Sequence, residues 1–221
     1  MTPSEPCDVY HAFTKTVTHD MKNPYKIEYR CTALPLVLKP FTLNMAEVFA
    51  QQANDPKVQA MDINFALPFT AEHAQAAIKR YIHDWNQKTC YYFAIFHAEQ
   101  GTFIGSISLR MYPEHQLADL GYWIGAEFWN RGYTSLAAYE MMRFAFVEFN
   151  IEKLNAQHMG HNMASGRVMQ KIGMTQEGIL RNHWLKEDKR YDLVLYGLLR
   201  SDFLAAQQKQ VVHPLKAQAM K

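Results

Sequence analysis

The segment Asn130-Arg131-Gly132-Tyr133-Thr134 combines residue types that could bind a phosphate group. It follows an apolar stretch at residues 120–124 and leads into a stretch with helical periodicity. A loop that enters the N-terminus of a helix exposes unpaired backbone N–H groups at the positive end of the helix dipole. Gly132 permits close approach of the backbone, and Arg131 adds a positive charge. The alternative is a tight turn in which Gly132 only supplies a positive φ.

A second polar segment, Asn162-Met163-Ala164-Ser165, begins the next expected helix, and Gly173 occupies its C-terminal position. We expect both helices to start at the same edge of the sheet, where their two strands part. Such an edge offers a cleft for an extended ligand.

The elements that must position these residues follow from apolar periodicity and turn residues. Thr42 is expected to cap a helix in which Ala46, Val48, Phe49 and Ala53 share one face, and Thr70 is expected to cap a second helix. The expected strands are 36–38, 91–96, 103–109, 120–124, 153–159, 174–180 and 191–199, the last two joined by the charged turn 186–190. Their order predicts an α/β (α+β) domain with a mixed, mainly antiparallel twisted sheet and helices on both faces.

Composition divides the chain into three parts. Residues 1–33 are polar and contain three prolines, so we interpret them as an N-terminal extension in which Ile27 to Cys31 could add a strand. Residues 34–204 form the single expected domain, with no internal repeat. Residues 205–221 are a polar C-terminal tail.

Overall composition excludes several classes of protein. Lys and Arg (23) nearly balance Asp and Glu (21), so the chain of 221 residues lacks the basic surplus of a nucleic-acid binder. Its three cysteines form no CxxC pair, and no apolar run approaches the roughly 20 residues that span a bilayer. The first residues lack the basic and apolar regions of a signal peptide. We therefore expect a cytoplasmic protein that binds neither nucleic acid nor membrane.

Two longer motifs carry a resemblance to a known family. Ala118 to Ile124, followed by Trp129 to Ser135, resembles the acetyl-CoA-binding motif of the GNAT superfamily of N-acetyltransferases. The residues from Asn162 to Met174 match the second signature of its RimJ/RimL-like branch, which acetylates N-terminal amines of ribosomal proteins. The stretch Tyr191 to Arg200 matches the closing strand of that branch.

The resemblance implies how acetyl-CoA, the co-substrate, would be bound. The strand at Tyr122, Trp123 and Ile124 would be interrupted by a bulge, and its backbone would pair with the pantetheine arm and polarise the thioester carbonyl. Asn162 would bind the pantetheine from the other side of the cleft. The pyrophosphate would lie against Asn130, Arg131, Gly132, Tyr133 and Thr134, with Ser135 in the first turn of the helix.

The resemblance also implies catalytic roles. Asp119 matches an acidic residue of this branch, so we expect it to act as the general base, through a water molecule. Ser165 matches the serine assigned as the acid near the departing sulfur. The alternatives are a solvent-facing carboxylate for Asp119 and a hydroxyl that bonds the helix's own N–H groups for Ser165.

The sequence departs from the family pattern at several positions. Trp129 and Thr134 occupy the first and last positions of the pyrophosphate loop, His161 stands where an acidic residue is common, and Trp184 replaces a second carboxylate. His158 and His161 lack a third ligand nearby, so no metal site is expected. His161 and His183 are secondary candidates for proton transfer, although an exposed loop position explains each of them.

The favoured function is therefore acetyl transfer to a primary amine, with a protein N-terminus as acceptor. Residues 61–68 and 186–190 are the expected walls of the acceptor pocket. Two alternatives are a small-amine acetyltransferase, acting on a polyamine or aminoglycoside, and a non-catalytic acyl-CoA-binding regulatory module. The sequence leaves open whether the protein forms a homodimer.

Overall fold

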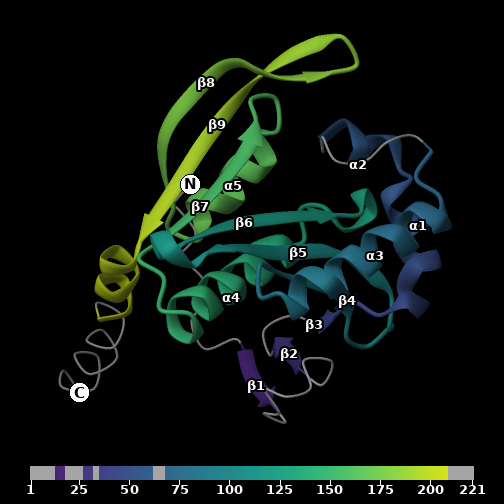
Figure 1. Cartoon of the computed structure of the whole chain (residues 1–221), viewed down its shortest axis with the longest axis horizontal. Coiled ribbons are helices and arrows are strands. Elements are labelled where there is room, and N and C mark those ends of the chain that lie inside the picture. The colour runs from purple at the N-terminus through teal and green to yellow at the C-terminus, as the bar shows by residue number, and fades with distance from the viewer. Residues whose placement is uncertain (1–12, 18–26, 32–34, 62–67, 209–221) are drawn as a thin grey trace, which may run out of the picture.

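One sheet of nine strands runs through the residues that the structure describes. The computed structural model describes residues 13–17, 27–31, 35–61 and 68–208. The strand order is β1-β2-β3-β4-β5-β6-β7-β9-β8 (Figure 1). The strands are β1 (Phe13–Val17), β2 (Ile27–Cys31), β3 (Leu36–Pro40), β4 (Cys90–His97), β5 (Phe103–Tyr112), β6 (Leu117–Ile124), β7 (Lys153–Met159), β8 (Thr175–Lys186) and β9 (Lys189–Leu199).

Only one pair of neighbouring strands in the described sheet is parallel. β6 and β7 run in the same direction, and every other neighbouring pair is antiparallel. A parallel pair needs a long crossover, which a helix supplies here. The expected mixed, mainly antiparallel sheet is thereby confirmed.

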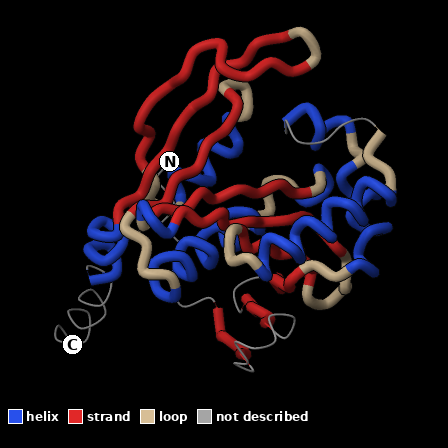
Figure 2. The backbone as a smooth tube through the Cα atoms, viewed as in Figure 1, coloured by secondary structure: helices blue, strands red, loops and turns tan. Residues whose placement is uncertain are grey.

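Helices cover both faces of this sheet, as expected (Figure 2). α1 and α3 pack with Phe41, Phe69 and Phe103 on one face, and α4 and α5 pack on the other face, where the larger apolar core lies. The helices are α1 (Ala46–Ala53), α2 (Pro56–Met61), α3 (Ala71–Asn86), α4 (Tyr133–Glu148), α5 (Met163–Lys171) and a last helix over residues 200–208. No helix of the described residues is long and apolar enough to cross a membrane.

Two of the helix starts follow directly from residues that the sequence singles out. The Thr70 side chain accepts a hydrogen bond from the backbone N–H of His73, and the His73 ring accepts one from the backbone of Thr70. Asn162 accepts a hydrogen bond from the backbone N–H of Ser165 in the same way. Each cap satisfies backbone donors that a helix leaves unpaired at its start.

The prediction for the first helix is wrong in detail. Thr42 precedes a short 3₁₀ turn (Leu43–Met45) and makes no capping bond to it, and α1 begins only at Ala46. Val48 is 38% exposed, whereas Phe49 and Ala53 are fully buried. The inward face of an α-helix repeats at three and four residues, and Val48 lies outside that repeat. The helix α2 was not predicted from the sequence.

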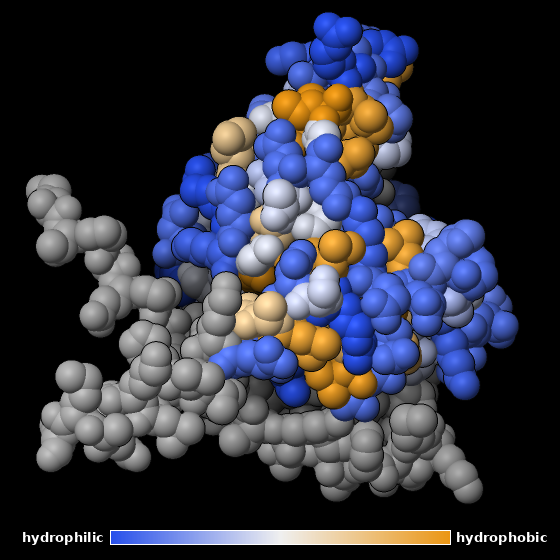
Figure 3. All heavy atoms as spheres, turned by 90° about the vertical axis from the view of Figure 1, so that its left-hand side faces the viewer, coloured by the Kyte–Doolittle hydropathy of each residue, from blue (hydrophilic) through white to orange (hydrophobic). Residues whose placement is uncertain are grey.

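The sheet extends further at both of its edges than expected from the sequence. β2 confirms the strand at Ile27 to Cys31, and β1 adds a further strand within the expected extension. β8 and β9 are also longer than predicted, and the turn between them is only Glu187 and Asp188, both with positive φ. Two successive positive φ values match the twist of a hairpin. Figure 3 shows apolar side chains below the charged tip of this hairpin. Three large apolar residues of β8 are exposed, namely Ile179, Leu180 and Leu185.

Candidate active site

A cleft opens where the two parallel strands separate. The pairing of β6 with β7 ends at Leu120 and Ala156, although β6 continues to Ile124 beside β5. A cavity of about 860 Å³ lies over these strands and reaches α3, β8 and β9. The expectation that the strands part at this edge is confirmed. The expected bulge is absent from the β5–β6 pairing, which is continuous from Leu117 to Ile124, and the opening arises instead from the separation of β6 and β7.

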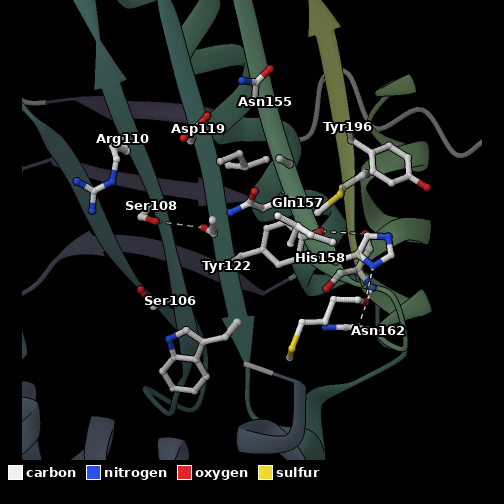
Figure 4. A pocket seen from close by; sticks show the side chains of 18 of the residues that line it. Ser106, Ser108, Arg110, Asp119, Tyr122, Asn155, Gln157, His158, Asn162 and Tyr196 are labelled. Atoms are coloured by element: carbon white, nitrogen blue, oxygen red, sulfur yellow. Dashed lines mark hydrogen bonds between the residues drawn. The ribbon is translucent and has the colours of Figure 1, made fainter. Parts of the chain in front are cut away.

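The floor of the cavity is polar. It is formed by alternate residues of three neighbouring strands, because successive side chains of a strand point to opposite faces. These polar residues are Ser106, Ser108 and Arg110 on β5, Asp119 on β6, and Asn155 and Gln157 on β7 (Figure 4). The apolar residues between them face the core on the α4 side.

Asp119 lies on this floor and is half-buried. The Tyr112 hydroxyl donates a 3.0 Å hydrogen bond to its Oδ2. Burial, together with the neighbouring Asp119 carboxylate, raises the pKa of Tyr112, so this hydroxyl stays a donor at neutral pH. The Asp119 carboxylate is therefore held on the cavity floor, on a strand rather than in a solvated loop.

Ser165 also lines the cavity, in the first turn of α5. The Tyr122 hydroxyl donates a 3.0 Å hydrogen bond to the Ser165 backbone oxygen, and Asn162 bonds the Ser165 backbone N–H. Burial raises the pKa of Tyr122, and a hydrogen bond with the Ser165 side chain partly opposes that effect. The side-chain cap of α5 is thus provided by Asn162. Asn162 and Ser165 both line the cavity.

The loop before α4 contains two residues in the left-handed backbone conformation. Asn130 and Gly132 both have positive φ, and Gly132 stands at the N-cap position without any side-chain cap. Arg131 is exposed, with its guanidinium carbon 5.9 Å from the ring centre of Phe128. Thr134 and Ser135 are half-buried in the first turn of the helix. No side chain at the N-cap position therefore bonds the backbone N–H groups of this first turn.

The structure separates the predicted binding residues into two groups. Asp119, Tyr122, Trp123, Asn162 and Ser165 line the cavity, whereas residues 130–135 lie outside its lining, at the start of α4. The side chains of Ile124 and Tyr133 are buried in the main core, so only their backbone could face a ligand. The Trp123 ring stacks on Phe49, at 5.6 Å between ring centres, on the α1 side of the sheet.

The three histidines proposed from the sequence do different things. His158 is buried, and its Nδ1 lies 2.8 Å from the Met159 backbone oxygen. A Cβ at position 166 would come within 2.8 Å of His158 Nε2, which explains Gly166 on the facing helix. His161 Nε2 bonds the Ala60 backbone oxygen, and His183 is exposed beside Trp184. Among the described residues no group of three His, Cys, Asp or Glu could hold a metal ion.

The expected walls of the acceptor pocket are only partly correct. Met61 lines the cavity, but residues 62–67 lie outside the described part of the chain. The turn at 186–190 does not line the cavity, because the β8–β9 hairpin extends beyond it, and Trp184, Leu193 and Leu195 line it instead.

The end of α2 is attached to the cleft by three side chains. Lys186 donates to the Gln59 backbone oxygen, His161 bonds that of Ala60, and Asn162 Nδ2 donates to that of Met61 at 3.3 Å. The last carbonyl groups of a helix lack partners within it, and these contacts supply them. Lys186 and His161 therefore help to hold the end of α2 in position.

Several cavity residues were not predicted from the sequence. Asn155 and Gln157 were expected only as parts of a strand, and Arg110 lay just beyond the expected end of another, yet all three line the cavity. The signal was the alternation of polar and apolar residues in Ser106 to Arg110 and in Leu154 to Gln157. Such alternation marks a strand with one polar face.

Comparison with known proteins identifies the class that this fold and cleft define. The acetyltransferase (GNAT) domain model matches residues 35–175, which is more than half of the chain. The chain therefore belongs to the GNAT N-acetyltransferase family, whose members transfer an acetyl group from acetyl-CoA to an amine.

Individual relatives are distant. The uncharacterized N-acetyltransferase p20 of Bacillus licheniformis is 25% identical over 171 residues, covering 76% of this chain and 94% of its own length. The ribosomal protein uS5 alanine N-acetyltransferase of Escherichia coli (strain K12) is 26% identical over 119 residues, 53% of this chain and 61% of its own. The structure of RimL, a ribosomal alpha-N-protein acetyltransferase in complex with coenzyme A, superposes with a TM-score of 0.68 at 17% identity, covering 75% and 94% of the two chains.

Proposed function

We propose that this enzyme acetylates a primary amine at a protein N-terminus, as its ribosomal-protein relatives do. The observation that carries the proposal is the shared cavity of Asp119 and Ser165, at the point where β6 leaves β7. An amine that enters this cavity meets a carboxylate on one side and a hydroxyl on the other.

The residues of the cleft fit acetyl-CoA. Beyond Leu120 the backbone of β6 has no pairing with β7, so residues 122–124 can pair with the pantetheine arm as an added strand. One N–H of this segment would polarise the thioester carbonyl. Asn162 lies on the opposite side, and its amide would exchange its bond with Met61 for one with the pantetheine.

The loop and the start of α4 fit the pyrophosphate. The first-turn N–H groups, the positive φ of Gly132 and the charge of Arg131 favour an anion there. Thr134 and Ser135 add hydroxyl donors. We assign the pyrophosphate to Asn130, Arg131, Gly132, Tyr133, Thr134 and Ser135, with Tyr133 acting through its backbone.

The proposed chemistry is a direct attack by the amine. The ammonium form must first lose a proton, which Asp119 takes through a water molecule. The nitrogen then forms a bond to the carbonyl carbon, and the carbon–sulfur bond breaks. Ser165 donates a hydrogen bond to the leaving sulfur, which ends as a thiol by taking the second proton from nitrogen.

A thiol-release assay tests this function. Purified enzyme mixed with acetyl-CoA and N-terminal peptides should release free coenzyme A, and mass spectrometry should locate the acetyl group on the α-amine. Asp119→Asn should slow turnover by about 100-fold, which is typical for loss of a general base. Acetylation of polyamines or aminoglycosides in place of peptides would favour the small-amine alternative, and an Asp119→Asn rate equal to wild type at every pH would refute the base assignment.

A further inference from the structure

Three polar side chains from neighbouring strands form a row on the cavity floor. Arg110 of β5 is paired with Asp119 of β6, and Asp119 is paired with Asn155 of β7. Residues at paired positions point to the same face of a sheet, with their Cβ atoms about 5 Å apart. Figure 4 shows the three side chains in this order across the cavity.

Asn155 presents an acceptor that no described residue of the protein uses. Its Oδ1 is buried and has no hydrogen-bond partner within the described part of the chain. Buried polar atoms in folded proteins are nearly always paired, so an unpaired one that lines a cavity points to a ligand. Because Oδ1 is an acceptor, the matching ligand group is a donor, and the N–H of an amine is one.

Arg110 presents donors at the other end of the row. Its Nη2 donates a 3.3 Å hydrogen bond to the Tyr92 hydroxyl, and a guanidinium carries five N–H donors in all. Carboxylate and phosphate oxygens fit this planar group in a bidentate manner. Tyr92 holds the guanidinium over the floor without neutralising its charge.

Among the described residues, positive and negative side chains around the cavity are equal in number. Lys153 and Glu177 form an ion pair at 2.7 Å. The remaining charged lining residues are Arg80, Arg110, Asp84 and Asp119, two of each sign. A polycation would meet Arg80 and Arg110, so this arrangement favours an acceptor that itself carries both signs of charge.

We propose that Arg110, Asp119 and Asn155 form the acceptor subsite, and that the acceptor is a primary amine with a carboxylate or phosphate group close to it. The amine nitrogen lies between Asp119 and the Asn155 Oδ1, and the anionic group binds Arg110. This proposal rests on the proposed acetyl transfer, in which Asp119 accepts the first proton and the sulfur the second. It adds that Arg110 selects the acceptor and that Asn155 contacts the reacting amine.

Matched acceptors test the subsite. Alanyl-aspartyl-phenylalanine amide and its asparaginyl counterpart differ only in one carboxylate, as do free aspartate and free asparagine. In at least one of the two pairs, the acidic member should show about tenfold higher kcat/KM, which is the effect of one charge-assisted hydrogen bond. A preference in the peptide pair identifies a protein terminus as the source of the amine, and a preference in the amino-acid pair identifies a small molecule.

Variants separate the two contacts. Arg110→Gln should reduce the acidic-to-neutral ratio to about one, whereas Lys79→Gln, which removes the same charge from the exposed side of α3 outside the cavity, should leave the ratio unchanged. Asn155→Leu should raise the KM of all acceptors about tenfold while the affinity for acetyl-CoA stays constant.

A binding measurement keeps this test separate from catalysis. The acidic and the neutral acceptor of each pair are titrated into enzyme saturated with coenzyme A. The acidic acceptor of the preferred pair should bind more tightly, and Arg110→Gln should abolish this difference in affinity. Equal binding of acidic and neutral members, unaffected by Arg110→Gln, would overturn the subsite even if acetyl transfer occurs. Failure to release thiol with any acceptor would instead overturn the proposed function, because the binding preference does not depend on turnover.

Discussion

The indole Nε1 of Trp129 donates a 2.9 Å hydrogen bond to the backbone oxygen of Ile124. This bond joins the loop before α4 to the last residue of β6, at the open end of the cleft. Trp129 is also packed against the main apolar core. The residue that departs from the family's loop pattern therefore fixes the loop relative to the strand that would pair with pantetheine.

Trp129→Phe should loosen the pyrophosphate loop without removing any ligand group. The ring is replaced by a smaller one and the hydrogen bond to Ile124 is lost, which should cost about 1 kcal/mol of unfolding free energy. We expect acetyl-CoA to bind about fivefold more weakly, as measured by calorimetry, with kcat at saturating acetyl-CoA nearly unchanged. A large loss of kcat at saturation would place Trp129 in the chemistry instead.

Ser165→Ala should lower turnover more than it lowers affinity. The hydroxyl is proposed to donate to the leaving sulfur, so its removal should reduce kcat about tenfold while the Kd for acetyl-CoA changes little. Because Asn162 caps α5, loss of the Ser165 hydroxyl should leave the melting temperature within about 2 °C of wild type.

The converse variant provides the control. Asn162→Ala removes the cap and the bond to Met61, so it should cost about 1 kcal/mol of stability and also weaken acetyl-CoA binding. If Ser165→Ala lost affinity while kcat stayed constant, Ser165 would be a binding residue only.

Several local features could be predicted from the sequence because their causes are local. The caps at Thr70 and Asn162, and the positive φ at Gly132, depend on residues within one turn. The row of Arg110, Asp119 and Asn155 depends on the register of three strands, and Asn155 is distant in the chain from the other two. No single segment carries that information, so the candidate acid and base could be proposed from motifs but the acceptor floor could not.

The contacts at the end of α2 should influence the acceptor rather than acetyl-CoA. Lys186→Met removes a side-chain donor to the Gln59 backbone oxygen, and Met61 at the same end lines the cavity. We expect the KM for the acceptor to rise about threefold while the acetyl-CoA Kd is unchanged. The matched control is Lys189→Met on the same hairpin, which should have no effect. A change in acetyl-CoA affinity without a change in the KM for the acceptor would contradict the proposal that the end of α2 lies at the acceptor side of the cavity.

Stability should fall in alkaline solution in a way that depends on Cys90. Burial raises the pKa of the Cys90 thiol from 9.0 to about 11. Above its ordinary pKa the unfolded chain releases this proton while the folded chain retains it, so the stabilisation is present below pH 9 and is lost as the pH rises through 11. Burial raises the pKa of the neighbouring Tyr92 as well.

Urea unfolding at about pH 8 and about pH 10.5 measures this effect. Between these values wild type should lose on the order of 2 kcal/mol more than Cys90→Ala, because the alanine variant has no thiol to titrate. Parallel losses in the two proteins would show that the native thiol titrates as it does in the unfolded chain.

Calorimetric titration of acetyl-CoA into wild type and Gly132→Glu decides whether the loop before α4 binds the cofactor. Glutamate at position 132 places bulk and negative charge at the start of α4, where the pyrophosphate is proposed to bind. Gly101→Glu is the matched control, because Gly101 also has positive φ and a side chain added there, in the turn between β4 and β5, would enter open space. We predict micromolar binding to wild type and Gly101→Glu and binding weaker by at least about 100-fold to Gly132→Glu, since the added carboxylate would repel the pyrophosphate. Equal affinity in all three proteins, or no binding to wild type at millimolar acetyl-CoA, would contradict the assignment of this loop.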